Sequence, residues 1–275
     1  MKKINTISFT EKVKNWLSNS GQPKILHVFD NACNLINEDR EVLSIVTPQI
    51  GNGPFNLVVN NKVLFSDYLS VESPVSILSN QIALGDLTIN TANAELWNPC
   101  PAWELLHAKR NEILNQLTKL PISDYEPLLP NSLISNFSFA LANADISTAK
   151  SLTSQLAGLG IGLTPSGDDF IMGATYATWI IHPFDIASVL AREITNTATP
   201  LTTSLSATWL RSAGKGGAGI LWHNFFDALI SADISLIQIT MNEILKVGET
   251  SGADALAGFV GVFKSSFEIK STTPQ

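Results

Sequence analysis

The first hundred residues alternate short apolar runs with turn-forming residues. β-Branched and aromatic side chains fill the runs, as is typical of strands, and Asn, Asp and Gly mark the turns between them. Hairpin turns are predicted at Asp30-Asn31, Asn60-Asn61 and Gly85-Asp86. The predicted strands are 24–29, 32–36, 42–46, 55–59, 62–65, 81–84 and 87–90. Their length and spacing indicate a small antiparallel sheet or a partly closed barrel.

Two further features belong to this β-rich part. Ser8 followed by Glu11 matches the pattern of a capped helix start, which predicts a short helix ahead of the first predicted strand. The segment 47–54 joins two predicted strands and reads Thr-Pro-Gln-Ile-Gly-Asn-Gly-Pro. A loop so rich in Gly and Pro is either a plain structural turn or a loop at the mouth of a site.

Near residue 100 the pattern changes, and apolar residues at helical spacing dominate from there to the end. The predicted helices are 101–120, 133–144, 147–156, 168–181, 186–197, 205–213, 220–230, 234–246 and 253–267. Candidate N-cap residues are Asp145, Ser166, Asp233 and Ser251. The sequence therefore predicts an α+β protein, with a β-rich N-terminal domain at 1–100 and a larger all-helical domain at 101–275.

One segment of the helical part is unusual in composition and recurs in part. Residues 158–169 read Gly-Leu-Gly-Ile-Gly-Leu-Thr-Pro-Ser-Gly-Asp-Asp and lead into the apolar stretch 170–181. The end of this segment, from Ser166 to Gly173, matches Ser251 to Gly258 in the pattern S-G-x-D-x-[IL]-x-G, at an offset of 85 residues. The repetition hints at two related helical units, although the sequences between them do not visibly match.

The recurring pattern has a purely structural interpretation. A Ser at the N-cap and an Asp three residues later satisfy each other's backbone amides and suit the helix dipole. Gly173 and Gly258 lie two turns further along each helix, where the missing side chain lets another helix cross closely. On this interpretation the two segments are capped helices packed together, with no chemistry.

The first segment also carries residues that capping does not require. Asp168 stands beside Asp169, and three glycines alternate at 158, 160 and 162. Thr164 and Ser166 add hydroxyls to the same turn. Such a cluster is able to orient amide or ammonium hydrogens, hold a divalent cation through oxygens or place a general base. Because the carboxylates oppose a bare phosphate, an amide-bearing substrate fits better than a naked anion.

These residues form the predicted site. We expect Asp168 and Asp169 to be catalytic, orienting substrate N–H groups or a bound cation. The expected substrate-binding residues are Gly160, Gly162, Thr164, Ser166, Gly167, Ser251, Gly252 and Asp254. The prediction requires the two recurring turns to lie close together and to enclose a small polar ligand.

Composition and charge argue against some classes of binding partner. The 275-residue chain has 17 Lys and Arg against 24 Asp and Glu, a net charge of −7, which argues against a nucleic-acid surface. Only four residues are Arg, namely Arg40, Arg110, Arg192 and Arg211. A phosphate site must therefore use backbone N–H groups, Lys or a partner chain.

The sequence identifies no cofactor and no metal site. Cys33 and Cys100 are expected to be reduced thiols, and the four His residues are scattered. The N-terminus begins like a signal peptide, but Glu11, Lys12 and Lys14 stand where its apolar core belongs. The apolar stretch 170–181 falls short of the roughly 20 residues that span a bilayer. We expect a cytoplasmic protein without a membrane partner.

Three weaker candidates have structural explanations. Residues 213–219, Ala-Gly-Lys-Gly-Gly-Ala-Gly, lack the spacing of a phosphate-binding loop, so a helix connector is the better interpretation. The hydroxyl-rich segment 202–206 precedes a predicted helix, and capping and a role in the site remain equally open. His182-Pro183 is interpreted as the end of a helix.

Four blocks of the sequence resemble the AllH-like family, described as a subunit of oxamate carbamoyltransferase. The first block is 160–169 with Gly173, and it reads Gly-Ile-Gly-Leu-Thr-Pro-Ser-Gly-Asp-Asp. The others are the segment 202–213, the block from Gly248 to Gly258, and Gly-Asn-Gly-Pro-Phe at 51–55. The resemblance covers essentially the whole chain, and its first block is specific.

The resemblance implies carbamoyl transfer between carbamoyl phosphate and oxamate, in allantoin and purine breakdown. In the catabolic direction, oxalurate is phosphorolysed and the carbamoyl phosphate feeds a carbamate kinase. The family's activity is associated with three different subunits, so the partners implied are other carbamoyltransferase subunits. The Ser-Thr-Arg-Thr phosphate loop of aspartate and ornithine carbamoyltransferases is absent. Phosphate is then bound in another way, or another subunit supplies the groups.

Three hypotheses follow for function. The leading one is a cytoplasmic subunit of a carbamoyltransferase complex that binds a small carboxamide or carboxylate between the turns at 164–169 and 251–254. The second is a non-catalytic scaffold or regulatory subunit that binds such a metabolite or docks its partners. The third is an independent metal-dependent amide hydrolase.

Overall fold

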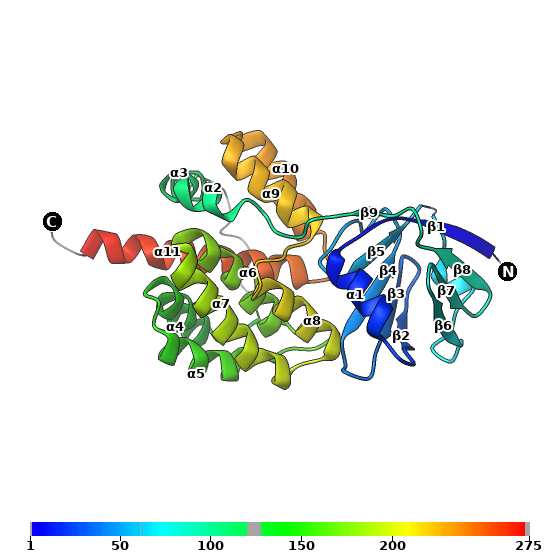
Figure 1. Ribbon diagram of the computed structural model, residues 1–275. Coiled ribbons are helices and arrows are strands. Elements are labelled where there is room, and N and C mark those ends of the chain that lie inside the picture. The colour runs from blue at the N-terminus through cyan, green and yellow to red at the C-terminus, as the bar shows by residue number, and fades with distance from the viewer. Residues whose placement is uncertain (1, 61, 120–127, 273–275) are drawn as a thin grey trace. The chain divides into compact units, whose positions relative to one another are not determined.

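The computed structural model (Figure 1) describes residues 2–60, 62–119 and 128–272, with side chains up to Ser266. The chain divides into two compact units, Met1–Pro99 and Cys100–Gln275. The first is β-rich and the second is helical, so the α+β class predicted from the sequence is confirmed.

The first unit is a sheet that curls into a nearly closed barrel. Its strands are β1 (Lys2–Phe9), β2 (Lys24–Val28), β3 (Ala32–Ile36), β4 (Val42–Val46), β5 (Asn56–Val59), β6 (Val75–Leu78), β7 (Gln81–Leu84), β8 (Leu87–Asn90) and β9 (Glu95–Leu96). They are ordered β2-β3-β4-β5-β1-β8-β7-β6, and β9 pairs with β1. Apolar side chains such as Leu35, Ile45 and Leu57 fill its core.

The sheet is mixed, whereas the sequence predicted antiparallel pairing. β1 runs parallel to β8 and β9, and β4 runs parallel to β5. The strand β1 was missed because its polar residues Thr6 and Ser8 are buried, which hides the usual alternation. The predicted strand 62–65 is absent from the described residues 62–65, where irregular backbone leads into a 3₁₀ turn, η1 (Phe65–Asp67). The predicted Asn60-Asn61 turn lies partly outside the described residues.

The predicted helix start at Ser8 was wrong by two residues. The helix α1 (Glu11–Asn19) is capped by Thr10, whose hydroxyl accepts the amide of Val13. Ser8 belongs to β1 and donates its hydroxyl to Asn52 Oδ1 at 2.6 Å. Thr10 also donates to the carbonyl of Pro54 at 2.9 Å. These bonds fix the Gly- and Pro-rich loop at 47–54 to its own unit, which favours the structural interpretation of that loop.

The second unit contains the helices predicted from the sequence, most of them within two residues of their predicted bounds. They are α2 (Trp103–Ala108), α3 (Arg110–Leu117), α4 (Asn131–Ala142), α5 (Ile146–Leu156), α6 (Ser166–Ile181), α7 (Phe184–Ala198), α8 (Ser204–Ala213), α9 (Ile220–Ser231), α10 (Ile234–Leu245) and α11 (Ser251–Thr272), with a 3₁₀ turn η2 (Thr199–Leu201). The predicted helix 101–120 is divided at Lys109 into α2 and α3, and Leu120 lies outside the described residues.

Aromatic side chains form the centre of the helical core. Trp103 lies against Tyr176 and Phe226, with ring centroids 6.2 and 5.1 Å apart. Trp222 and Phe259 extend the cluster, with centroids 5.6 Å apart. Because α2, α6, α9 and α11 each contribute a ring, the cluster fixes the helices that carry the predicted site.

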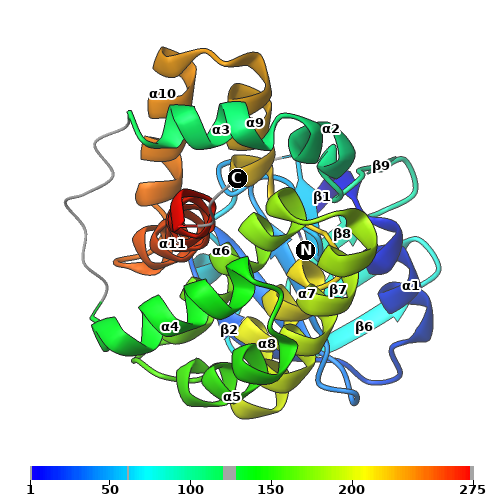
Figure 2. The same ribbon diagram turned by 90° about the vertical axis from the view of Figure 1, so that its left-hand side faces the viewer.

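Two helical hairpins of this unit are built alike. In each, a residue with a left-handed backbone precedes an Asp N-cap: Ala144 (φ 55°) precedes Asp145 before α5, and Ala232 (φ 59°) precedes Asp233 before α10. Both sequences read Ala-Asp-Ile-Ser at this turn. Figures 1 and 2 show α4 beside α5 and α9 beside α10. The hairpin, loop and helix from α4 to α6 are thus repeated from α9 to α11.

Candidate functional site

The site predicted from the sequence lies where α6 and α11 begin. These two helices pack closely along each other, as Figure 1 shows. A methyl group on Gly173 of α6 would lie 1.7 Å from the carbonyl oxygen of Ala255, and one on Gly258 of α11 would lie 2.1 Å from that of Phe170. Each glycine is the eighth residue of its helix and faces the fifth residue of the other helix. The contact is therefore reciprocal, as in a local two-fold axis.

The turns that lead into the two helices also correspond. Gly167 donates its amide to Leu159 O at 2.8 Å, and Gly252 donates to Val247 O at 3.0 Å. A methyl group on Gly167 would lie 2.0 Å from Leu156 O. One on Gly252 would lie 1.8 Å from Ile244 O. Both glycines are buried and serve close packing of the turn against the preceding helix, and their amides already have protein partners.

The first turn is longer than the second. Leu159 and Gly167 are eight positions apart, whereas Val247 and Gly252 are five positions apart. Gly160 and Gly248, both with positive φ, approach Ser166 and Ser251 respectively, so they correspond as well. The three additional residues of the first turn are therefore 161–163. Gly160 and Gly162 are exposed, and Ile161 is 95% exposed.

The N-caps differ in part from those expected. Asp145 and Asp233 cap α5 and α10 by accepting the amides of Thr148 and Leu236, as predicted. Ser166 was predicted as the N-cap of α6, but Pro165 precedes the helix and Ser166 is its first residue. Ser251 is likewise the first residue of α11, not the residue before it. The hydroxyls of both serines are thus not required for capping.

Asp168 is held by protein groups on both carboxyl oxygens. Oδ1 accepts the amide of Gly158 at 2.9 Å. Oδ2 accepts the hydroxyls of Thr202 and Ser206, the latter at 2.8 Å. Asp168 is 1% exposed, and its burial raises its pKa against the opposing effect of these bonds. It therefore joins the glycine-rich turn to α8 and its preceding segment. Thr203 caps α8, so the segment 202–206 serves capping and Asp168 together.

Asp169 has a different environment. It is 6% exposed, and burial raises its pKa to about 8, assisted by the nearby charges of Asp254 and Asp168. Hydrogen bonds from the hydroxyls of Ser251 and Thr164 act in the opposite direction. Oδ2 of Asp169 has no hydrogen-bond partner among the described residues. A buried carboxyl beside a second carboxyl holds its proton near neutral pH.

Both helix starts contribute to one cluster, which we call the acid corner and define as Thr164, Asp169, Ser251 and Asp254. The hydroxyl oxygens of Thr164 and Ser251 are 3.0 Å apart across the two turns. Asp254 is fully buried, and it occupies in α11 the position of Asp169 in α6. Thr164 and Ser251 are half-buried. The acid corner thus consists of two buried carboxyl groups beneath two half-buried hydroxyls.

The remaining candidates have structural roles. The glycine-rich connector at 213–219 accepts indole N–H groups, from Trp179 at Ala213 O (2.9 Å) and from Trp103 at Gly216 O (2.8 Å). His182 ends α6 and bonds the carbonyl of Leu141. Cys33 is buried and Cys100 is exposed, and no disulfide joins them.

Two kinds of feature are absent from the residues that the structure describes. No group of three or more His, Cys, Asp or Glu side chains is placed there to hold a metal ion. None of the helices described is both long enough and apolar enough to cross a membrane.

Comparison with protein families agrees with the architecture. Residues 156–263 match the family model described as oxamate carbamoyltransferase subunit AllH. Residues 5–96 match the model described as the AllH family N-terminal domain. The chain belongs to the AllH family. The first match spans the acid corner, the turns before α6 and α11 and the connector at 213–219. No solved structure matches the chain.

Sequence reasoning missed the side chains that hold Asp168 and the pairing of Asp169 with Asp254. Thr202 and Ser206 were noted as hydroxyls before a helix, and nothing in the sequence pairs them with Asp168, which is 34 and 38 positions away. Asp254 was predicted as a substrate-binding residue on the strength of the recurring pattern. The structure adds an electrostatic interaction with Asp169, which makes the two carboxyl groups a pair.

Proposed function

We propose that this chain is a catalytic subunit of an oxamate carbamoyltransferase complex and contributes the acid corner to its active site. Membership of the AllH family supports the reaction class. The observation that carries the catalytic role is the pair Asp169 and Asp254, buried together where two equivalent helix starts meet. Burying two adjacent carboxyl groups destabilises a fold. A pair that is kept in spite of this cost is therefore a candidate for a functional site.

The reaction requires a proton to be moved at a nitrogen atom. In the synthetic direction the amide nitrogen of oxamate attacks the carbonyl carbon of carbamoyl phosphate. A C–N bond forms, the C–O bond to phosphate breaks and the nitrogen loses a proton. In the catabolic direction phosphate attacks oxalurate, the C–N bond breaks and the nitrogen regains a proton. A group that titrates near neutral pH performs both transfers well.

The acid corner fits this requirement. A pair of adjacent carboxyl groups shares one proton over a wide pH range and titrates as a unit. With its pKa at about 8, Asp169 carries a proton at neutral pH, beside the carboxyl group of Asp254. In the proposal this pair takes the amide proton of oxamate and returns it in the reverse direction. The hydroxyls of Thr164 and Ser251, at the half-buried edge, orient the substrate.

The proposal reassigns several residues of the predicted site. Asp168 becomes a positioning residue, because its oxygens are occupied by Gly158, Thr202 and Ser206. Gly167 and Gly252 become packing residues. Gly160, Gly162 and Ser166 remain proposed substrate contacts, since they lie at the accessible edge of the turn. The charges that act on Asp169 are carboxylates, so we place the cationic groups for phosphate on other subunits of the complex.

The test is Asp169→Asn in the reconstituted complex, assayed in both directions. We expect a decrease in kcat/KM of about 10²–10⁴, the usual contribution of a positioned acid or base. Asn is close in shape to a protonated Asp, so the fold is retained. The matched control is Asp145→Asn, the same change at an N-cap outside the corner, where Asn caps as well as Asp and activity stays unchanged.

The outcomes separate the proposal from its alternatives. Turnover by Asp169→Asn equal to that of the wild type would reject the catalytic role and favour a scaffold subunit. Equal loss in the Asp145→Asn control would assign the effect to folding. Inactivation of the wild-type complex by a chelator, with recovery on adding a divalent cation, would instead support the metal-dependent alternative.

A further inference from the structure

A small pocket lies in the helical unit far from the acid corner. It has a volume of about 220 Å³ and lies between the start of α3, the ends of α4 and α6, and α11. The helix α6 runs from Ser166, beside the acid corner, to Ile181 at the pocket, roughly 22 Å at the rise of an α-helix. The volume is below that of pockets for drug-sized ligands, so it suits a ligand of few atoms.

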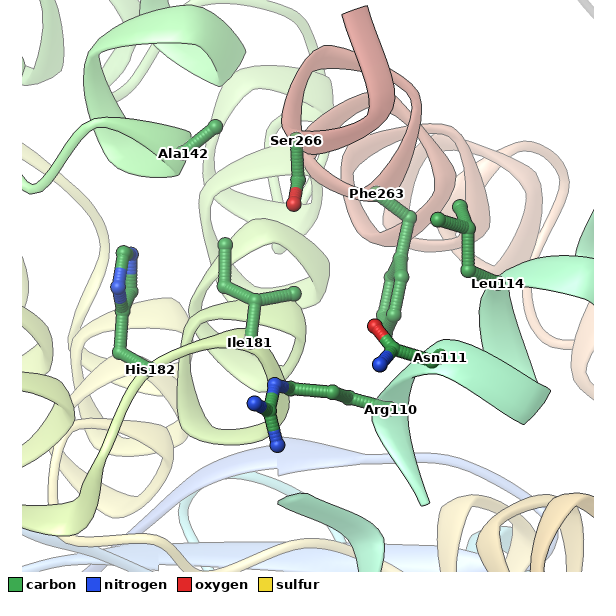
Figure 3. A pocket seen from close by; sticks show the side chains of 8 residues that line it. All are labelled: Arg110, Asn111, Leu114, Ala142, Ile181, His182, Phe263 and Ser266. Carbon is green, nitrogen blue, oxygen red and sulfur yellow. The ribbon is translucent and has the colours of Figure 1, made fainter. Parts of the chain in front are cut away.

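The pocket combines an apolar floor with a few polar groups. Leu114, Ile181 and Phe263 provide the apolar surface. Figure 3 shows the polar ends of the other side chains arranged around Ile181, and these belong to Arg110, Asn111, His182 and Ser266. An apolar cavity with a small number of polar groups that converge on it is typical of sites for small metabolites.

Arg110 gives the pocket its charge. Its guanidinium donates one hydrogen bond, from Nη1 to His107 O at 2.9 Å, and it forms no ion pair among the described residues. A guanidinium has five N–H donors, so most of them remain available. The neighbouring Lys109 differs, since it bonds Ile230 O at 3.0 Å and lies 3.7 Å from Glu112. None of the lining residues that the structure describes is acidic.

Two histidines form hydrogen bonds to backbone carbonyls that would otherwise repel an anion here. Helices α4 and α6 both end at the pocket, and the unpaired carbonyls of a helix end carry partial negative charge. His182 Nε2 bonds Leu141 O at 2.7 Å, and His107 Nδ1 bonds Ile180 O at 2.8 Å. Burial lowers the pKa of His182, so its ring is neutral and donates from Nε2. One last-turn carbonyl of each helix is thereby bonded within the protein.

We propose that this pocket binds a small carboxylate, held by the guanidinium of Arg110 and by the polar groups of Asn111 and Ser266. A guanidinium matches the planar geometry of a carboxylate through two parallel N–H bonds. The apolar floor accommodates a short carbon body. A phosphate dianion is a poorer match, because a single guanidinium over an apolar floor leaves several of its oxygens without donors.

The experiment titrates the purified full-length chain with acetate and, separately, with inorganic phosphate, and follows backbone amide chemical shifts. We expect saturable binding of acetate with a millimolar Kd, and shifts concentrated at the start of α3 and the end of α6. Arg110→Gln should weaken acetate binding at least tenfold. Arg110→Lys, which keeps the charge without the planar fork, should weaken it by a smaller factor.

The matched control is Arg192→Gln, which removes an exposed cation from α7 and should leave acetate binding unchanged. If Arg110→Gln fails to fold, Asn111→Leu, at an exposed position, takes its place with the same expected direction. The proposal is overturned by the absence of saturable acetate binding, by shifts confined to the acid corner, by binding unaffected in the folded variants, or by phosphate binding tighter than acetate. None of these outcomes depends on carbamoyl transfer.

Discussion

The turn that starts α6 and the turn that starts α11 share one plan and differ in three respects. Each has an amide-to-carbonyl bond that closes the turn, a glycine pressed against the preceding helix and an Asp at the fourth helical position. Only the first has a second carboxylate, Asp168, where the other has Ala253, and only the first has three additional residues. The first also has Pro165 where the second has Thr250. The shared features form the contact between the two helices. The features found only in the first turn are not needed for that contact, so they indicate that the first turn is the one adapted for a further role.

The largest effect is expected at the reciprocal helix contact. Gly173→Ala places a methyl group 1.7 Å from Ala255 O, and Gly258→Ala places one 2.1 Å from Phe170 O. Backbone atoms of a packed helix cannot move aside cheaply, so we expect each change to lower the free energy of unfolding by at least about 4 kcal/mol. Chemical denaturation measures the change.

The control for this prediction is Gly261→Ala on the same helix. A methyl group there would lie 2.8 Å from Ser138 Oγ, the end of a side chain that is able to rotate. Loss of stability under about 1 kcal/mol is expected, since Ala also favours the helix. If Gly258→Ala lowered the free energy of unfolding as little as Gly261→Ala does, the crossing of the two helices would not be tightly constrained.

The second effect tests the carboxylate that only the first turn possesses. Asp168→Ala makes the α6 start resemble that of α11, but it leaves the amide of Gly158 and the hydroxyls of Thr202 and Ser206 without their acceptor. Buried donors without partners destabilise a fold, so we expect a loss of about 3 kcal/mol. Thermal and chemical unfolding measure it. A loss below 0.5 kcal/mol, on the order of an exposed change, would show that these bonds contribute little.

The third effect concerns pH and the carboxyl groups that both turns share. Burial holds the pKa of Asp169 at about 8 in the folded state, above that of the unfolded chain. The folded protein therefore binds more protons between about pH 4 and pH 8, and its stability falls as pH rises through that interval. Asp169→Asn removes this contribution. Between pH 4.5 and pH 8, the free energy of unfolding of the variant should rise relative to that of the wild type. We expect a rise of at least about 1.4 kcal/mol, which corresponds to a shift of one pKa unit.

The measurement is denaturant unfolding at several pH values for both proteins. Asp145→Asn serves again as control, because its carboxyl is exposed and its pKa is lowered by capping bonds, which gives stability at higher pH. Parallel stability profiles for the wild type and Asp169→Asn above pH 4 would contradict the shared proton.

Much of this architecture was predictable, and the limits have physical causes. The helical spacing of apolar residues and the N-caps Asp145 and Asp233 are features of the local sequence. The helices of the second unit could therefore be predicted from it. The recurring S-G-x-D pattern pointed to two related turns, because close packing permits only Gly at the crossing. Strand β1 could not be recognised, since Thr6 and Ser8 are buried polar residues. The partners of Asp168 and the pocket at Arg110 depend on tertiary contacts that no local pattern encodes.

The smallest effect on stability, and the sharpest test of the comparison, is deletion of the three additional residues Ile161, Gly162 and Leu163. The deletion gives the first turn the length of the second, whose closing bonds show that the shorter chain suffices. Shortening an exposed loop changes closure entropy little, so stability should stay within about 1 kcal/mol. Ile161 is 95% exposed, and the carbonyl of Leu163 accepts the Thr203 hydroxyl in a single bond that contributes about 1 kcal/mol.

If the addition serves only to connect α5 and α6, the reconstituted complex should keep its activity after the deletion. We expect instead that kcat/KM falls by about tenfold or more while the folded chain remains stable, since the exposed glycines border the proposed substrate site. The three residues contribute one hydrogen bond, which the carbonyl of Leu163 accepts from the Thr203 hydroxyl at 2.6 Å, and their ordering costs backbone entropy. Full activity of the shortened chain would remove Gly162 from the site and leave the acid pair, common to both turns, as its sole basis.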